Sequence, residues 1–164
     1  MRTPVQQYIL LTLSLLAPST FAQDTHIESL RGLKGVRVTV EDLYPEAEGA
    51  GLTRSQLQTD AELKLRLAAI PILDSHGEPT LYINVNAIAL QRSPNFAFSV
   101  DVDLFQNVIL LRDLNILVAG AATWHSENLI GVVTRSQFVE VVRNGTRDLV
   151  DDFINAYLTA NPKK

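Results

Sequence analysis

Two alternating segments constrain the fold of this chain more than any other feature of its sequence. LYINVNAIAL at 81–90 and FAFSVDVDLF at 96–105 each alternate apolar and polar residues, which is typical of a strand with one buried face. The RSPN sequence at 92–95 is rich in turn-forming residues. Together the three segments predict a β-hairpin with a four-residue turn.

The register of this hairpin assigns its two faces. With Gln91 opposite Phe96, the inner face carries only apolar cross-strand pairs, such as Val85 with Val102. The outer face then holds a rectangle of four polar side chains: Asn84, Asn86, Asp101 and Asp103. We expect these residues to form a shallow polar binding surface, and a solvated face without a ligand is the alternative.

Further strands flank the hairpin. Alternating valines predict a strand at 36–40, and a third antiparallel strand is predicted from about Ile116 to Ser126. In an even register this third strand would place Trp124 beside Asp103 on the outer face. Trp124, the only tryptophan, would then add an aromatic platform to the polar surface.

The outer side chains become apolar towards one end of the predicted sheet. These side chains, on two neighbouring strands, are Phe105, Ile109, Leu111, Ile116 and Val118. Leaving apolar area in water costs about 25 cal/mol per Å², so we expect this end to be an interface. Its cover would be an arm at 23–32, a second copy of the protein or a different partner.

Two helices are predicted from a six-residue pattern that occurs twice, as LTRSQL at 52–57 and VTRSQF at 133–138. In each copy a threonine precedes a glutamine at capping-box spacing, and flanking apolar residues form a hydrophobic staple. The pattern therefore indicates two helix starts and not a repeated binding site. We expect one helix over 53–69, ended before Pro71, and one long helix over 134–160.

These elements predict an α+β fold, with an antiparallel sheet of about four strands and two helices packed on one face. A single domain over 33–164 accommodates them. The sequence VAGAAT at 118–123 is small on both faces of its strand, which would let the long helix approach closely through Gly145. A cavity for an apolar ligand needs the same small side chains, so that alternative stays open.

The first 22 residues have the pattern of a secretory signal peptide. Arg2 precedes a short apolar run at 8–17, and small residues stand just before Gln23. The run is too short to span a bilayer comfortably. We expect cleavage between Ala22 and Gln23, a flexible arm over 23–32, and a periplasmic or secreted protein with no transmembrane segment.

The cysteine content and the net charge limit the kinds of partner and anchor that we expect for this protein. The chain has no cysteine, so an exported form must be held together by packing and cannot be lipidated at a cysteine. The formal net charge of −4 becomes −5 when Arg2, the only charge in residues 1–22, is removed. An acidic chain repels a phosphate backbone, so nucleic acid is not an expected partner.

Candidate catalytic and metal-binding residues are few. DSHGEP at 74–79 brings three potential metal ligands into one loop, but no second cluster supplies more. His125 and Ser126 are neighbours in a predicted strand, so they point to opposite faces and cannot act as base and nucleophile. Common hydrolase, zinc-protease and phosphate-loop motifs do not occur. We therefore expect no catalytic residue, no metal and no cofactor.

The element order over residues 33–160 is strand, helix, three antiparallel strands and a long C-terminal helix. This order resembles small periplasmic α+β domains, namely the lipopolysaccharide-assembly lipoprotein and the amino-terminal part of TolB-type envelope proteins. The segment TRDLVDDFINAYLTANP at 146–162 resembles the closing helix of exported bacterial proteins that have no assigned activity. The resemblance implies a binding or assembly module of the envelope, although the lipobox cysteine of the lipoproteins is missing.

Three hypotheses about function follow. The first is a non-catalytic exported module that contacts an envelope protein, or itself, through its polar sheet face or its apolar sheet end. The second is a carrier of a small apolar or amphipathic ligand, held between the helices and residues 118–123. The third is an uncharacterised hydrolase.

Overall fold

The computed structural model describes residues 26–75 and 77–162. After a short helical turn at 26–28, the elements are β1 (Arg37–Val40), α2 (Pro45–Gly49), α3 (Arg54–Leu67), β2 (Thr80–Ala89), β3 (Asn95–Leu110), β4 (Asp113–His125), β5 (Leu129–Thr134) and α4 (Arg135–Ala160). The predicted signal peptide and the first three residues of the predicted arm lie outside the described residues.

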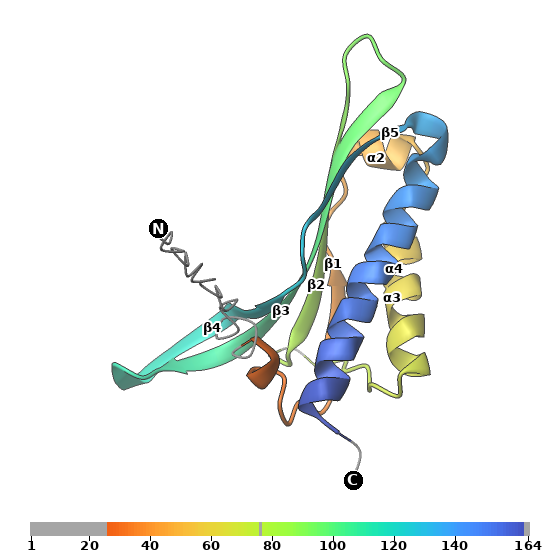
Figure 1. Cartoon of the computed structure of the whole chain (residues 1–164). Coiled ribbons are helices and arrows are strands. Elements are labelled where there is room, and N and C mark those ends of the chain that lie inside the picture. The colour runs from red at the N-terminus through yellow and green to blue at the C-terminus, as the bar shows by residue number, and fades with distance from the viewer. Residues whose placement is uncertain (1–25, 76, 163–164) are drawn as a thin grey trace, which may run out of the picture.

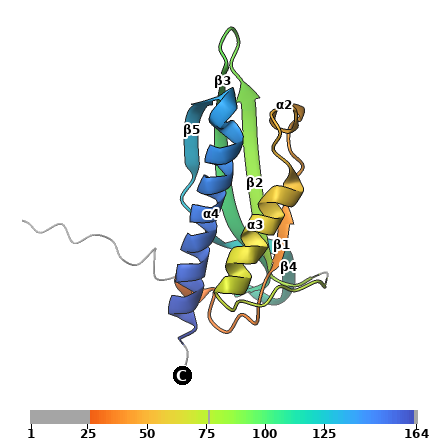
Figure 2. The same ribbon diagram turned by 90° about the vertical axis from the view of Figure 1, so that its right-hand side faces the viewer.

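The predicted α+β class is confirmed, with more elements than expected. Five strands, and not about four, form one sheet in the order β1-β2-β3-β4, with β5 also paired to β3. β1 runs parallel to β2, whereas the other pairs are antiparallel. The described chain has four helical segments where two were predicted, but only α3 and α4 are long. These two lie side by side over one face of the sheet (Figures 1 and 2).

β5 was not predicted from the sequence. It pairs with the first six residues of β3, 95–100, while β4 pairs with the same side of β3 farther along. Between them, the Ser126 N–H donates to the Val102 carbonyl at 2.9 Å, which continues the ladder. β4 and β5 therefore form one interrupted edge of the sheet.

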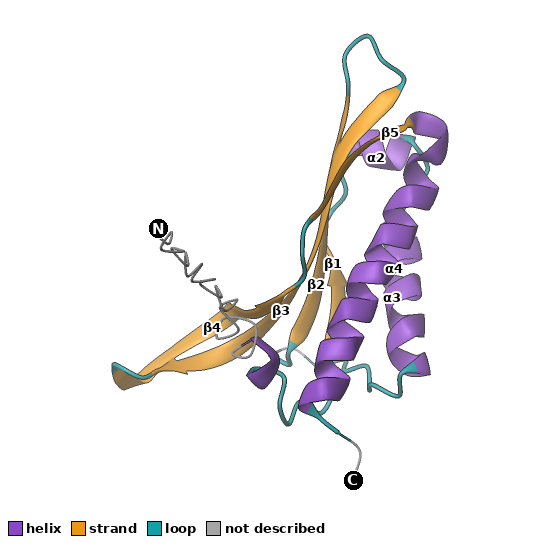
Figure 3. Cartoon of the chain, viewed as in Figure 1, coloured by secondary structure: helices purple, strands orange, loops and turns teal. Residues whose placement is uncertain are grey.

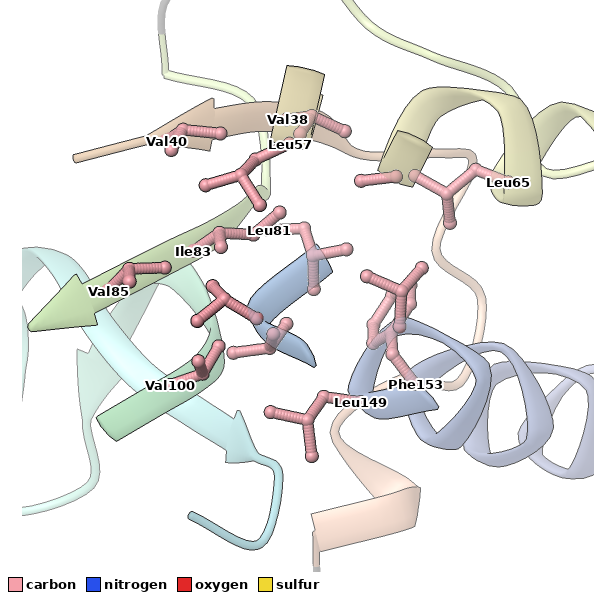
Figure 4. Close-up of a cluster of buried hydrophobic side chains, with 14 of the residues drawn as sticks. Val38, Val40, Leu57, Leu65, Leu81, Ile83, Val85, Val100, Leu149 and Phe153 are labelled. Carbon is pink, nitrogen blue, oxygen red and sulfur yellow. The ribbon is translucent and has the colours of Figure 1, made fainter. Parts of the chain in front are cut away.

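The core lies between this sheet and the two long helices. Leu57 and Leu65 of α3 and Leu149 and Phe153 of α4 point towards the inner side chains of β1, β2 and β3 (Figure 4). Val85 and Val102 are both buried, as the predicted assignment of the two hairpin faces requires. The predicted inner face is therefore confirmed.

The hairpin register differs from the predicted one by two residues. Ala89, and not Gln91, faces Phe96, and the loop spans 90–94. The Leu90 N–H donates to the Asn95 carbonyl at 2.9 Å and Arg92 adopts a left-handed φ of 58°, which together close the loop earlier. A shift of two residues preserves the faces because side chains alternate with period two.

The two predicted capping boxes have different outcomes. Thr53 and Gln56 form theirs, because each side chain accepts a hydrogen bond from the backbone N–H of the other. At α4 the Thr134 hydroxyl instead donates to the Gln137 side chain at 2.9 Å and caps no backbone N–H. Thr134 is also the last residue of β5, which fixes its backbone. The prediction of one long C-terminal helix is confirmed.

α3 and α4 are joined by an ion-pair network. Asp60 accepts hydrogen bonds from Arg143 at 2.8 and 3.0 Å and from Arg147 at 2.9 Å. The bonds from Arg143 outweigh the effect of burial and hold the pKa of Asp60 below its ordinary value. The same contact raises the pKa of Arg143. The carboxylate of Asp60 therefore links α3 to two arginines of α4 and stabilises the packing of the two helices.

The described part of the predicted flexible arm is packed. Leu30 is fully buried in the core. The Gly32 N–H donates to the Asn161 side chain at 2.7 Å, and the Asn161 amide donates to the Leu30 carbonyl at 2.9 Å. The packed domain therefore begins before residue 33, the start predicted from the sequence.

Candidate functional site

The outer face of the sheet, opposite α3 and α4, carries the four predicted polar residues. The cross-strand pairs on this face are Asn86 with Ser99, Asn84 with Asp101, and Tyr82 with Asp103. All six side chains are half-buried. The predicted partners, Asn86 with Asp101 and Asn84 with Asp103, are wrong because of the two-residue shift. The four residues nevertheless share one face, as predicted.

Acidic groups set the electrostatics of this face. Burial, reinforced by the charge of Asp101 and opposed by His125, raises the pKa of Asp103. Burial and the nearby Glu41 raise the pKa of Tyr82. Both shifts mean that added negative charge is unfavourable here. The face suits neutral or cationic hydrogen-bonding groups better than anions.

Trp124 does not belong to this polar surface, contrary to the prediction. It lies opposite Leu104, is only 6% exposed, and packs edge to face on Phe153 at 5.3 Å between ring centroids. His125 takes the outer position opposite Asp103. The register of β4 shifts between Leu104 and Phe105. A one-residue shift moves side chains to the other face, which explains the error.

The predicted apolar end of the sheet is a projecting two-stranded ribbon. We call residues 105–121 the ribbon, because β3 and β4 continue there as a pair beyond Phe105, the last residue of β3 that β2 contacts. The ribbon extends away from the helices (Figure 1), and none of the helices that the structure describes lies against its outer half (Figure 3).

Large aliphatic side chains of the ribbon are exposed. Five are between 40% and 95% exposed: Ile109, Leu111, Leu114, Ile116 and Leu117. Ile109 lies opposite Leu117, whereas Val118 lies opposite Val108. The predicted interface residues are therefore divided between both faces of the ribbon and do not share one face. Phe105, at the base, packs edge to face on Tyr82 at 5.6 Å.

Bulges bend the ribbon away from the domain. Register shifts occur at three places along the β3–β4 pair. Gly120 adopts a φ of 68°, which favours glycine, and its N–H donates to the Asn107 side chain at 3.3 Å. Such bulges increase local bending and twist. The projection is thus encoded in the ribbon itself.

The N-terminal segment braces the base of the ribbon. The Ser29 hydroxyl donates to the Thr123 carbonyl at 2.8 Å, and the Gln106 amide donates to the Ser29 carbonyl at 3.1 Å. Beyond these contacts, the exposed aliphatic side chains show that residues 26–32 do not cover the outer half of the ribbon.

A cleft of about 940 Å³ lies where this segment meets α4 and the β4–β5 junction, and the sequence analysis did not identify it. Its lining includes Trp124, Glu127 and Asp152. The rings of His26 and His125, also in the lining, are in edge contact at 4.4 Å. Burial, together with the charge of Glu127, raises the pKa of Asp152. The residues come from three distant segments, so spacing in the sequence could not bring them together.

The small residues at 118–123 do not face α4, contrary to the prediction. They belong to the exposed strand of the ribbon and its base. Gly145 instead packs against Leu129 of β5, whose Cδ2 atom would lie 2.1 Å from an added Cβ. The alternative, a ligand cavity between the helices and residues 118–123, therefore lacks its walls in the part of the chain that the structure describes.

The candidate catalytic pair is separated as predicted. Ser126 is buried and its Oγ accepts from the Val102 N–H at 3.1 Å, while His125 is exposed on the opposite face. Within residues 26–75 and 77–162 no three potential ligands are arranged to hold a metal ion. His76 of the 74–79 loop lies outside the described residues.

No protein-family model matches the chain, and no curated protein matches it significantly. Among the described residues, no helix combines the length and apolar character needed to cross a membrane.

Proposed function

We propose that this protein is an exported, non-catalytic binding module that contacts a partner protein through its ribbon. The exposure of five large aliphatic side chains on a two-stranded ribbon that none of the described residues covers supports this proposal. Such a ribbon is marginally stable by itself in water. Burying its side chains would contribute about 25 cal/mol per Å² of apolar area. A partner that covers the ribbon would supply this stabilisation.

The polar outer face extends the proposed contact surface. The Tyr82–Phe105 contact joins the base of the ribbon to the row that contains Asp103. An apolar patch bordered by polar residues is typical of protein interfaces. The partner would place aliphatic groups on the ribbon and neutral or cationic groups on the acidic face.

We infer an extracytoplasmic setting from the predicted signal peptide. Cell fractionation followed by N-terminal sequencing tests this setting. The expected product begins at Gln23 and occurs outside the cytoplasm. A cytoplasmic chain that retains residues 1–22 would contradict export without bearing on the ribbon.

Photo-crosslinking in the producing cells tests the contact itself. A photoreactive phenylalanine replaces Leu117 on the ribbon in one variant and Leu67 in the other. Leu67 is a matched control, since it is a leucine on α3 with 79% exposure and lies outside the ribbon. We expect a protein adduct from position 117 and none from position 67. Equal amounts of adduct from positions 117 and 67, or no adduct from position 117, would contradict the proposal.

The cleft favours a second candidate function, the carriage of a small ligand. Trp124 and Ala156 offer apolar contact there, and the carboxyl groups of Glu127 and Asp152 favour a cationic group on the ligand. Native mass spectrometry of protein purified from its own host tests this candidate. A bound mass that is lost in the Asp152→Lys variant supports it, and bare protein argues against it.

A further inference from the structure

We propose that the partner of the ribbon is a second copy of this chain, and that two ribbons pair edge to edge in one continuous β-sheet. This inference rests on the proposed function and specifies its partner. Three properties of the ribbon lead to it: open backbone edges, the absence of residues that protect an edge, and a charge distribution that suits self-pairing.

The backbone of the ribbon has hydrogen-bonding groups with which another strand could pair. Beyond Phe105, β3 pairs only with β4, and β4 pairs only with β3, among the residues that the structure describes. Each strand therefore has one row of N–H and C=O groups without a strand partner. A lipid surface could bury the aliphatic side chains, but it would leave these groups without hydrogen bonds, which a hydrocarbon environment does not tolerate. A β-strand satisfies both requirements.

The residues of the ribbon do not protect the free edge of β3. Natural edge strands avoid pairing by means of lysine, proline, inward charges, bulges or very short length. The extra residues at the register shifts of the ribbon lie on β4, so the edge of β3 stays regular. The 17 residues 105–121 contain neither lysine nor proline. By contrast β1, at the other edge of the sheet, has only four residues. An open, apolar and regular edge such as that of β3 is expected where pairing is functional.

The charges favour a second copy. The ribbon has one basic residue, Arg112, and one acidic residue, Asp113, so it is neutral within a chain of net charge −4. Two acidic molecules repel each other least when they meet through their neutral parts. In an antiparallel pair, the tip of each ribbon approaches the base of the other. Arg112 would then approach the acidic base, where Asp101 and Asp103 lie.

Disulfide trapping tests the pairing in the purified mature protein. The chain has no cysteine, so a single introduced thiol can form a disulfide only with the same position of another copy. Single variants are made along the ribbon: Asn107→Cys, Asn115→Cys, Leu117→Cys and Ala119→Cys. The control is Leu67→Cys on α3. We expect a disulfide-linked dimer from at least one ribbon position under mild oxidation at a concentration where the control stays monomeric. Ribbon variants that dimerise no more than the control overturn the inference.

Sedimentation velocity gives an independent test without oxidation. We expect twice the chain mass for the wild type, and a dissociation constant raised about tenfold to a hundredfold by Leu117→Asp, because the charge would be buried at the interface. The control variant Leu67→Asp should leave the dissociation constant of the dimer unchanged. Circular dichroism verifies that each variant is folded, and a variant that does not fold is replaced by Arg112→Glu, which should weaken pairing by repelling the acidic base. A monomeric wild type at high concentration overturns the inference.

The in-cell adduct at position 117 separates the two proposals. An adduct of two copies, identified by co-purification of two differently tagged chains, supports self-pairing. An adduct with a different protein overturns self-pairing and keeps the binding module, whereas no adduct overturns both. Flotation with phosphatidylethanolamine–phosphatidylglycerol vesicles covers the lipid outcome. Binding of a monomer to these vesicles that Leu111→Asp abolishes would assign the ribbon to a membrane surface and overturn self-pairing.

Discussion

At the scale of single residues, one bulge decides which side chains are available for binding. An even register of the third strand would place Trp124 beside Asp103, but with the shift between Leu104 and Phe105, Trp124 faces inward and His125 outward. A bulge adds one residue to one strand without a strong signal in composition, so alternation alone could not locate it. The sequence shows a glycine at position 120, but it does not show that the backbone of Gly120 adopts a left-handed conformation.

Tryptophan fluorescence checks this correction directly. Because Trp124 is the only tryptophan and is buried against Phe153, the native protein should emit at shorter wavelength than free tryptophan and resist quenching by iodide. Unfolding in denaturant should shift the emission to longer wavelength. Native emission like that of free tryptophan would indicate the outward position predicted from the sequence.

Gly35 is a residue whose replacement the fold should not tolerate. A Cβ added there would lie 2.4 Å from the Pro71 carbonyl oxygen, a backbone atom that cannot rotate away. We expect Gly35→Ala to lower the free energy of unfolding by about 1–3 kcal/mol or more. Gly49→Ala is the matched control, since its Cβ would meet no atom within 4 Å. Urea denaturation of both variants gives the comparison, and equal stability would contradict the close approach.

At the scale of elements, the reliable signals are those that repeat along the chain. The hairpin faces follow from a period of two, so they survive a register error of two residues that changes every cross-strand partner. The long α4 follows from apolar spacing sustained over 26 residues. β5 has only six residues and runs straight into α4, so neither period develops in it. The cleft and the Asp60 network depend on tertiary packing, which has no local signature.

The contact between α3 and α4 depends on Asp60. Asp60→Asn should lower the free energy of unfolding at pH 7 by about 2–4 kcal/mol, because it leaves Arg143 and Arg147 without their carboxylate. Since the folded pKa of Asp60 lies below the unfolded value near 3.8, its contribution is present above that value and is lost as the pH falls through the folded pKa. The difference between wild type and variant should therefore shrink in acid.

Thermal and urea unfolding at pH 7 and near pH 3 measure this contribution. Asp42→Asn serves as the control, because Asp42 also pairs with an arginine, Arg54, but is 88% exposed. Its replacement should cost less than about 1 kcal/mol. Equal costs for the two variants would show that the Asp60 network does not hold the helices together.

At the scale of the whole molecule, the chain combines a packed α+β domain with a projecting two-stranded ribbon. The helices cover one face of the sheet, and the core between them is closed. The ribbon extends the same sheet away from the helices (Figure 1). Its exposed apolar side chains lie on both of its faces. The sequence predicted an apolar sheet end with an interface, but neither its separation from the domain nor its open edges. Those features depend on where β2 ends relative to β3.

Amide hydrogen exchange along the ribbon tests the central claim most directly. If two copies pair through this region, exchange in residues 106–121 should slow as the protein concentration rises, while the core strand over 81–87 stays protected at every concentration. If the ribbon is free, its exchange should be fast and independent of concentration, and that result would contradict self-pairing.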